Sequence, residues 1–190
     1  AKNNIPANSF VILYVGKLVS WKGVHNLIYA AKILKNRGTK DFVVAVAGKG
    51  AQKEAMERLI KQAGLEENFR FLNFISYDEM PDAYRMADAF ILPSYPTMLW
   101  QEQFGMVLIE AMASGKPIIS TNSGSIPEVV GDAGILISPG NFFHLAEVAA
   151  NLMNNKGFAS EMGNKSRQRA EMYFNAKKNA LKFYDIMKAI

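Results

Sequence analysis

The chain has 190 residues, of which 49% are hydrophobic and 21% are charged, a composition typical of a globular domain with a buried core. It contains no cysteine, which excludes disulfides, thiolate nucleophiles and zinc–thiolate sites. No apolar run approaches the roughly 20 residues that span a bilayer, and no signal peptide is recognised, so we expect a soluble, cytoplasmic protein. The net charge of +5 leaves three alternatives open: an evenly basic surface, a patch that faces a membrane, or a site for phosphate anions.

The first half of the sequence alternates between two patterns. Residues 10–15 and 42–47 are continuous apolar runs, which is typical of strands buried on both faces. After each run, apolar residues recur at spacings of three and four, and this predicts helices at about 23–38 and 51–64. Each predicted helix ends at a glycine, a residue common at helix C-termini.

The same alternation continues along the rest of the chain. Further strands are predicted at 69–72, 89–93, 117–121 and 135–137, with helices at 78–86 and around 105–114. From residue 142 onward the pattern is helical in three pieces, with breaks near 155–157 and near 175. We expect residues from about 156 to 190 to form a helical C-terminal extension.

Strands that alternate with helices predict βαβ units, and right-handed crossovers join these into a parallel sheet with helices on both faces. The expected fold class is therefore α/β, a doubly wound parallel sheet in a single Rossmann-like domain. Ligands of such folds bind beyond the carboxyl ends of the strands. The loops that follow Val15, Ala47, Leu72, Pro93 and Thr121 are the candidate site.

The loop after the first predicted strand reads GKLVSWKG at residues 16–23. Its glycines allow a close backbone approach, Lys17 and Lys22 offer ammonium groups to an anion, and a predicted helix begins at Gly23. The spacing is not G-x-G-x-x-G, so a nicotinamide-type fingerprint is absent. A tight turn that carries two surface lysines is the structural alternative.

Two carboxylates flank the start of the predicted helix at 105–114. Glu102 lies in the preceding loop, whereas Glu110 lies in the helix among apolar neighbours. A carboxylate in such surroundings needs hydrogen-bond donors, and the hydroxyls of a ribose would supply them. The alternative is that Glu102 caps the helix and that Glu110 pairs with a lysine or with a backbone N–H.

At this point the sequence resembles a known family. Glu102 to Glu110 is similar to the E-x7-E motif of retaining glycosyltransferases of the GT-B fold, particularly glycosyltransferase family 4. Residues 16–23 resemble the family's G-R-L-x-x-x-K-G loop, and residues 87–94 (ADAFILPS) resemble its A-D-x-x-x-x-P-S strand. Residues 123–130 (SGSIPEVV) are similar to its G-G-x-P-E-V-V segment, and the likeness extends from about residue 11 to residue 141.

The resemblance implies a site for a nucleotide-diphosphate sugar. Glu102, Lys17 and Lys22 would be its catalytic residues, with Glu102 on hydroxyls of the transferred sugar and the lysines on the diphosphate leaving group. Glu110 would bind the ribose hydroxyls. The remaining substrate-binding positions that the family implies are Gly16 in the first loop, Ile75 beside the base, and the backbone N–H groups of Phe104, Gly105 and Met106.

Two positions depart from the family pattern. Lys17 stands where the family usually has arginine, so a point charge replaces a bidentate clamp on phosphate. Asn73 stands where glycine is frequent, which puts the base-side loop in doubt.

Such enzymes have two Rossmann-like domains, and the chain resembles the C-terminal one, which binds the donor. The resemblance implies that residues 1–190 lack an N-terminal acceptor domain and that the chain alone is inactive. It implies transfer of a hexose, with retention, to a glycan or lipid-linked acceptor, without a metal or other cofactor and without nucleic acid. Association of the parent enzyme with the inner face of a membrane is a further expectation.

Two other classes of function are compatible with the residues. One is a binding module or subunit that holds a nucleotide sugar without chemistry of its own. The other is an enzyme of different activity on the same fold, a nucleotide-sugar epimerase or a phosphorylase, although no pyridoxal lysine site is evident. Turnover of nucleotide sugar without an acceptor would distinguish an epimerase from a transferase.

Overall fold

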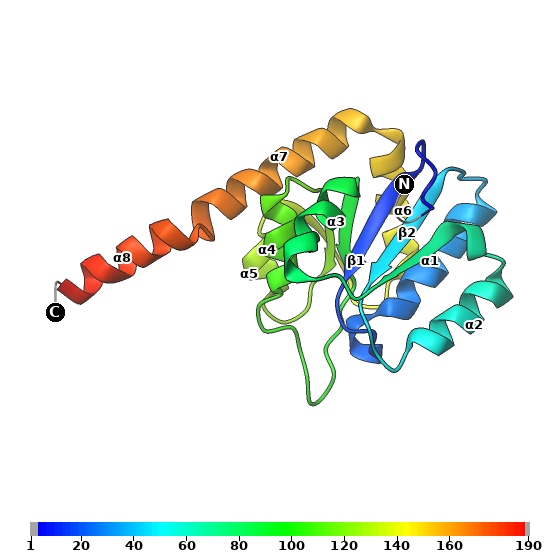
Figure 1. Ribbon diagram of the computed structural model, residues 1–190, viewed down its shortest axis with the longest axis horizontal. Coiled ribbons are helices and arrows are strands. Elements are labelled where there is room, and N and C mark those ends of the chain that lie inside the picture. Colours follow the sequence, from blue (N-terminus) through cyan, green and yellow to red (C-terminus); the bar gives the residue numbers. More distant parts are fainter. Residues whose placement is uncertain (1–3, 189–190) are drawn as a thin grey trace.

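The computed structural model describes residues 4–188, which form a six-stranded parallel sheet with helices on both faces (Figure 1). The strand order is β3-β2-β1-β4-β5-β6, so the direction of winding reverses between β1 and β4. This reversal is the topological switch point at which doubly wound folds bind ligands. The predicted fold class is confirmed. The strands are β1 (Phe10–Val15), β2 (Phe42–Ala47), β3 (Phe69–Asn73), β4 (Ala89–Leu92), β5 (Ile118–Thr121) and β6 (Gly134–Ile137).

The helices form a layer on each face of the sheet. Right-handed crossovers place α1 and α2 on one face of the sheet, and α1 packs there against α2 and α6. Helices α3, α4 and α5 cover the other face, where α4 packs against α5 and α7. The helices are α1 (Val24–Asn36), α2 (Lys53–Ala63), α3 (Met80–Met86), α4 (Met106–Ala113), α5 (Ile126–Val130), α6 (Phe142–Asn154), α7 (Lys156–Tyr173) and α8 (Ala176–Lys188).

The sheet supplies the centre of the core. Every residue of β2, β4 and β5 is buried, as the continuous apolar runs predict. Tyr14, Tyr84, Phe42 and Phe90 are the largest side chains that are fully or almost fully buried. The two tyrosines have polar hydroxyls that need partners in this core, and both of these hydroxyls are directed to the candidate site described below.

The structure contains short helical segments that were not predicted from the sequence. Residues 126–130, predicted only as part of a family segment without a secondary structure, form α5, and Ser20–Lys22 form a 3-10 turn, η1, inside the first loop. Pro127 lies in the first turn of α5, where the missing N–H of proline costs no helical hydrogen bond. Strand β4 ends just before Pro93, and β5 begins just after Pro117, so neither strand includes the proline that was predicted within it.

The last two helices differ in their packing. Helix α7 belongs to the domain, since it packs on α4 and the hydroxyl of Ser166 donates to the carbonyl of Ala133 at 2.7 Å. Gly163 lets it approach closely, because a Cβ there would lie 2.4 Å from the carbonyl oxygen of Gly115. Helix α8 buries none of its described residues and projects from the domain (Figure 1).

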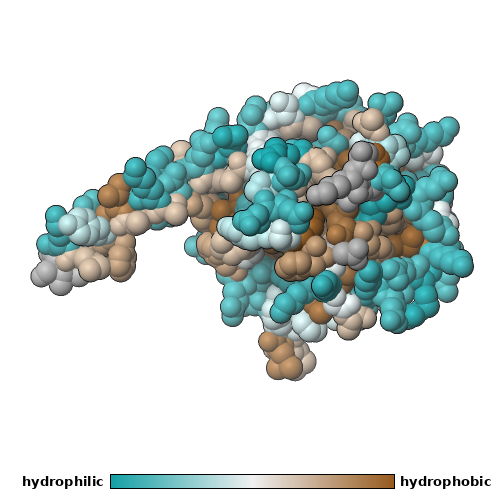
Figure 2. All heavy atoms as spheres, in the orientation of Figure 1, coloured by the Kyte–Doolittle hydropathy of each residue, from teal (hydrophilic) through white to brown (hydrophobic). Residues whose placement is uncertain are grey.

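Exposed apolar side chains are prominent on two parts of the chain that project from the domain (Figure 2). Along α8, the exposed residues are Leu181, Phe183, Tyr184, Ile186 and Met187. The second part is the tip of the loop between β4 and α4, where Met98 and Leu99 are almost fully exposed. Among the helices of the described chain, none combines the length and apolar character that crossing a bilayer requires.

Candidate functional site

Two loops interlock at the carboxyl edge of the sheet, one after β1 and one after β4. Gly23, at the end of η1, has a left-handed φ of 69°, and a Cβ there would lie 1.9 Å from the carbonyl oxygen of Pro93. Only glycine permits that approach. Two residues away on each loop, the N–H of Tyr95 donates to the carbonyl of Trp21 at 3.0 Å. The backbones of the two loops are therefore fixed against each other at the switch point.

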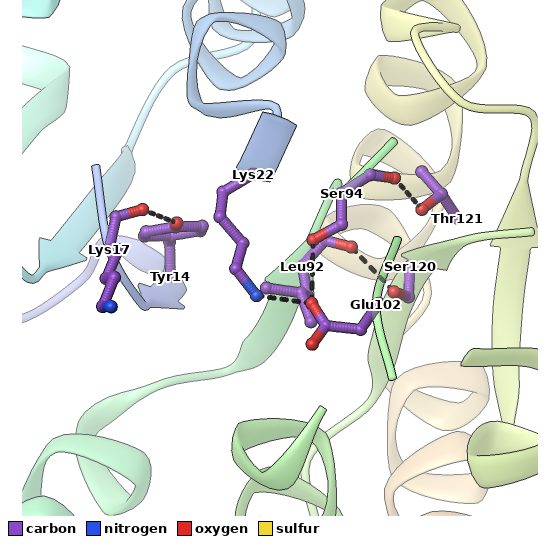
Figure 3. A network of polar contacts seen from close by, with 8 residues as sticks. All are labelled: Tyr14, Lys17, Lys22, Leu92, Ser94, Glu102, Ser120 and Thr121. Atoms are coloured by element: carbon purple, nitrogen blue, oxygen red, sulfur yellow. Dashed lines mark hydrogen bonds and ion pairs between the residues drawn. The ribbon is translucent and has the colours of Figure 1, made fainter. Parts of the chain in front are cut away.

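An ion pair joins the side chains of these loops (Figure 3). The Nζ of Lys22 lies 2.5 Å from Oε2 of Glu102, and both side chains are largely buried, with 17% and 10% of their surface exposed. The ammonium group also lies 4.8 Å from the ring centroid of Trp100, within the range of a cation–π contact. Trp100 in turn contacts Trp21 at a centroid distance of 6.1 Å. A cation, an anion and two indoles thus share one corner of the site.

Buried hydroxyl groups hold Glu102 and the strand ends in place (Figure 3). The hydroxyl of Ser94 donates to Oε2 of Glu102 at 3.2 Å, and the hydroxyl of Thr121 donates to the carbonyl of Ser94. Ser120 donates to the carbonyl of Leu92 at 2.7 Å, so β4 and β5 are cross-linked by side chains as well as by their ladder. Glu102 is therefore a preorganised carboxylate rather than a mobile loop residue.

Ser123, just past β5, is an exception among these hydroxyl groups. Its oxygen is the single buried side-chain polar atom without a hydrogen-bond partner in the described residues. The next residue, Gly124, lies against Glu102, since a Cβ there would approach its carbonyl oxygen to 2.1 Å. An unsatisfied buried hydroxyl beside a candidate site is typical of a group that water or a ligand completes.

Lys17 joins the network through its main chain. The buried hydroxyl of Tyr14 donates to the carbonyl of Lys17 at 2.8 Å, whereas the side chain of Lys17 is exposed and extends away from the contacts drawn (Figure 3). Burial, and secondarily the negative charge of Glu102, raises the pKa of Tyr14, so its hydroxyl keeps the proton that it donates. The half-buried Gly16 precedes Lys17, and its N–H donates to the carbonyl of Ala47.

Helix α4 begins at Met106, four residues after Glu102, and its N-cap Gly105 lies close to the Glu102 side chain, since a Cβ on Gly105 would lie 3.6 Å from Cγ of Glu102. Gly105 is its N-cap with a left-handed φ of 72°, and Phe104 and Met106 are exposed on either side. Within residues 4–188, the N–H groups of Phe104, Gly105 and Met106 have no hydrogen-bond acceptor. Free N–H groups at a helix N-terminus attract anions, so this turn adds partial positive charge next to Lys22.

Glu110 lies in the second turn of α4 and has an unexpected partner. Its Oε2 accepts a hydrogen bond of 2.7 Å from the hydroxyl of Tyr84, a buried residue of α3. The partner is therefore neither a lysine nor a backbone N–H. Within residues 4–188, Glu110 pairs with Tyr84 whereas the ammonium group of Lys22 pairs with Glu102, so no hydrogen bond or ion pair links Glu110 to the Lys22–Glu102 pair.

Ile75, predicted to border a base, lies past β3. It is half-buried on the wall of a hollow of about 810 Å³ that also involves Phe74, Ala83 and Met86. This hollow lies along α3 and does not include the Lys22–Glu102 corner. Ile75 thus lines this hollow, and the hydrogen bonds and ion pair described above do not include it.

Five further residues of the site were not predicted from the sequence. Tyr14 contacts Lys17, Tyr84 contacts Glu110, and Ser94 contacts Glu102. Trp100 contacts Lys22, and Thr121 contacts Ser94. Of the five, only Ser94 stands in a motif that the family shares. The position of Ser94 directly after a buried strand was the available signal. The roles of Tyr84, Trp100 and Thr121 depend on contacts between segments that are distant in sequence.

The fold and the site together define a class: a doubly wound α/β domain whose basic and acidic side chains gather at the switch point. Within this class, the family of glycosyl transferases group 1 matches residues 1–169, so the chain belongs to that family. The match covers most of the domain, including every site residue described above.

Individual relatives agree with this assignment. The chain is 36% identical over 159 residues to the 2-deoxystreptamine N-acetyl-D-glucosaminyltransferase of Niallia circulans, a match that covers 82% of this chain and 39% of the relative. It is 30% identical over 128 residues to the O-antigen chain mannosyltransferase B of Escherichia coli, covering 67% of this chain and 32% of that protein. The chain thus spans about two fifths of the length of the curated relatives it matches, or less.

Solved structures share the fold. HepE of Anabaena in complex with UDP superposes with a TM-score of 0.86 at 23% identity, over 97% of this chain and 50% of that one. The C-terminal domain of the glycosyl transferase group 1 protein LpcC from Francisella tularensis superposes with a TM-score of 0.76 at 26% identity, over 88% and 87% of the two chains. The fold described here is therefore the fold of a domain that forms a structure on its own.

Proposed function

We propose that this chain is the donor-binding domain of a retaining glycosyltransferase and binds a nucleotide-diphosphate sugar at the carboxyl edge of its sheet. The observation that carries the proposal is the Lys22–Glu102 pair, 2.5 Å apart, beside the free N–H groups of the first turn of α4. A diphosphate needs a cation and oriented N–H groups, and a sugar hydroxyl needs a carboxylate. All of these groups occur within two interlocked loops.

Four of the predicted residues bind the donor through their side chains in the proposed site. Lys22 and Lys17 stabilise the negative charge that develops on the diphosphate when the sugar leaves through an oxocarbenium-like state. Glu102 binds hydroxyls of the transferred hexose, and Glu110 binds the ribose. No metal is needed, because lysines and helix N–H groups supply the positive charge. The names of the relatives and the UDP and UDP-glucose complexes of HepE support a nucleotide sugar as the ligand.

The whole reaction needs a second domain in this proposal. The chain covers only half of HepE and 39% of its Niallia circulans relative, and the remainder of such enzymes would hold the acceptor. The acceptor is a glycan or a lipid-linked molecule, and the parent enzyme works at the cytoplasmic side of a membrane. The exposed apolar residues of α8 are the part of this chain that we assign to contact with the missing domain.

A thermal-shift panel of nucleoside diphosphates and their sugar conjugates tests the proposal. A ligand at 100 times its dissociation constant stabilises the folded domain by about 2.7 kcal/mol, which is roughly 5–11 °C for a domain of this size. We expect at least one nucleoside diphosphate to raise the melting temperature, with or without chelator. A panel without any shift at millimolar ligand would refute donor binding, and a shift that chelator abolishes would refute independence from metal.

A further inference from the structure

The only hydrogen bond that the carboxylate of Glu110 makes in the described residues comes from Tyr84. The two residues lie on different helices, α3 and α4, and 26 positions apart in sequence. The phenol ring is 2% exposed and packs against Phe90 at a centroid distance of 5.8 Å. Its hydroxyl lies 2.7 Å from Oε2 of Glu110 and 3.4 Å from the carbonyl of Val107, so the single proton goes to the nearer and charged acceptor.

This contact gives the two carboxylate oxygens of Glu110 different partners. Oε2 is occupied by the buried phenol, and the half-buried position of Glu110 leaves Oε1 to accept hydrogen bonds from a ligand. Because the ring is held on all sides, the hydroxyl is a fixed donor and sets the plane of the carboxylate. Burial, followed by the hydrogen bond and the charge of Glu110, raises the pKa of Tyr84, so the phenol does not lose this proton at neutral pH.

We propose that Tyr84 is a positioning residue that aims the carboxylate of Glu110 at the ribose hydroxyls and so makes the site selective for ribonucleotides. The proposal rests on the proposed function, in which Glu110 binds the ribose. Without the phenol, Oε2 loses its only protein donor and the side chain is free to rotate. The ribose contact weakens, whereas contacts to base, phosphate and sugar do not depend on this hydroxyl.

The test is the substitution Tyr84→Phe, which removes one oxygen and keeps the buried ring. Isothermal titration is carried out with UDP, GDP and ADP, each paired with its 2′,3′-dideoxy counterpart. In the wild type, the ribonucleotide that binds is expected to bind tighter than its dideoxy counterpart. In Tyr84→Phe, its affinity falls about 2- to 12-fold while that of the dideoxy ligand is unchanged, as removal of one hydrogen bond predicts.

Two matched variants define the cause. Tyr29→Phe removes a hydroxyl from a half-exposed ring that packs on Phe142, and it should leave both affinities unchanged. In a Glu110→Ala background, Tyr84→Phe should cost nothing further for the ribonucleotide, because the two residues act through one contact. Should Tyr84→Phe fail to fold, Tyr84→Met, which also removes the hydroxyl and keeps an apolar side chain at this buried position, must show the same selective loss.

The outcomes separate the two proposals. If the wild type binds none of the three diphosphates, the proposed function fails. If the wild type prefers the ribonucleotide and Tyr84→Phe keeps the full preference, the proposed function stands and the role of Tyr84 is refuted. An equal loss for both ligands would also refute it, because a structural defect does not distinguish ribose from dideoxyribose.

Discussion

Replacing Lys22 with methionine tests the centre of the proposed site. The substitution keeps most of the unbranched aliphatic stem beside Trp100 and removes the ammonium group, which lies 2.5 Å from Glu102. We expect binding of a nucleoside diphosphate to weaken and binding of the nucleoside to stay the same. The reason is that only the diphosphate carries the charge that the ammonium group would meet.

The expected size follows from the surroundings of Lys22. At 4 Å and an effective dielectric constant near 20, two unit charges interact by about 4 kcal/mol before desolvation is subtracted. The side chain of Lys22 is only 17% exposed, so water only partly screens its attraction to a phosphate. The net gain is smaller than the full attraction, because Lys22 must give up part of its contact with Glu102 to bind phosphate. A net loss of about 1–3 kcal/mol, or roughly 5- to 150-fold in Kd, is expected for a hydrogen bond between charged groups.

Glu102→Gln should change the affinity in the opposite direction. In the free protein, the carboxylate of Glu102 pairs with the ammonium group of Lys22, and its negative charge repels a diphosphate. The neutral amide of glutamine should therefore allow tighter binding of a diphosphate that carries no sugar. Titration calorimetry of both variants measures the two signs. Lys49→Met is the matched control, since Lys49 follows the neighbouring strand β2 and its ammonium group lies 5.2 Å from the ring centroid of Phe74, whereas Lys22 is the residue paired with Glu102. If Lys22→Met weakens nucleoside and diphosphate equally, or if Lys49→Met has the same effect, Lys22 is not a phosphate ligand.

Three further predictions concern the fold around the site. Gly23→Ala should lower the melting temperature by at least about 3 °C, because the new Cβ would collide with the carbonyl of Pro93 and a φ of 69° is strained for alanine. An unchanged melting temperature would contradict the close packing of the two loops. Folding raises the pKa of Tyr14 and Tyr84 above the ordinary 10.0, so above pH 10 these two phenols ionise only in the unfolded chain. The free energy of unfolding should therefore fall by up to about 1.4 kcal/mol per pH unit for each tyrosine as the pH rises above 10. Urea denaturation should show a shallower fall in each Tyr→Phe variant. Truncation after Asn175 should leave the melting temperature within about 1 °C, because α8 buries none of its described residues, and a larger drop would show that α8 packs on the domain.

The sequence predicted the strands and most helices because their signals are local. Strands β1 and β2 were predicted at the observed residues, since continuous apolar runs between polar segments define a doubly buried strand. Helix α5 was missed because its five residues are too few to show a helical period. The position of the site at the carboxyl edge also followed from the alternation of strands and helices, because topology alone determines that edge.

The contacts within the site were not predictable in the same way. Glu110 was expected to need a donor, but that the donor is Tyr84 depends on how α3 packs on α4. Lys22 and Glu102 were placed at the same edge from the sequence, 80 residues apart, without any indication that they touch. Such pairings are determined by tertiary packing, for which a single sequence contains no periodic signal. The roles assigned to these residues in ligand binding stay predictions.

The nature of the Lys22–Glu102 pair argues that it exists for binding rather than for stability. In a partly buried ion pair, the Coulomb attraction between the charges is largely offset by the free energy of removing both charges from water. An apolar pair of similar size would stabilise the same contact at least as well. The loops are already held by Gly23 against Pro93 and by the hydrogen bond from Tyr95 to Trp21. These backbone contacts hold the loops independently of the two charges, whereas the proposed site for a phosphate and a sugar hydroxyl uses one of each.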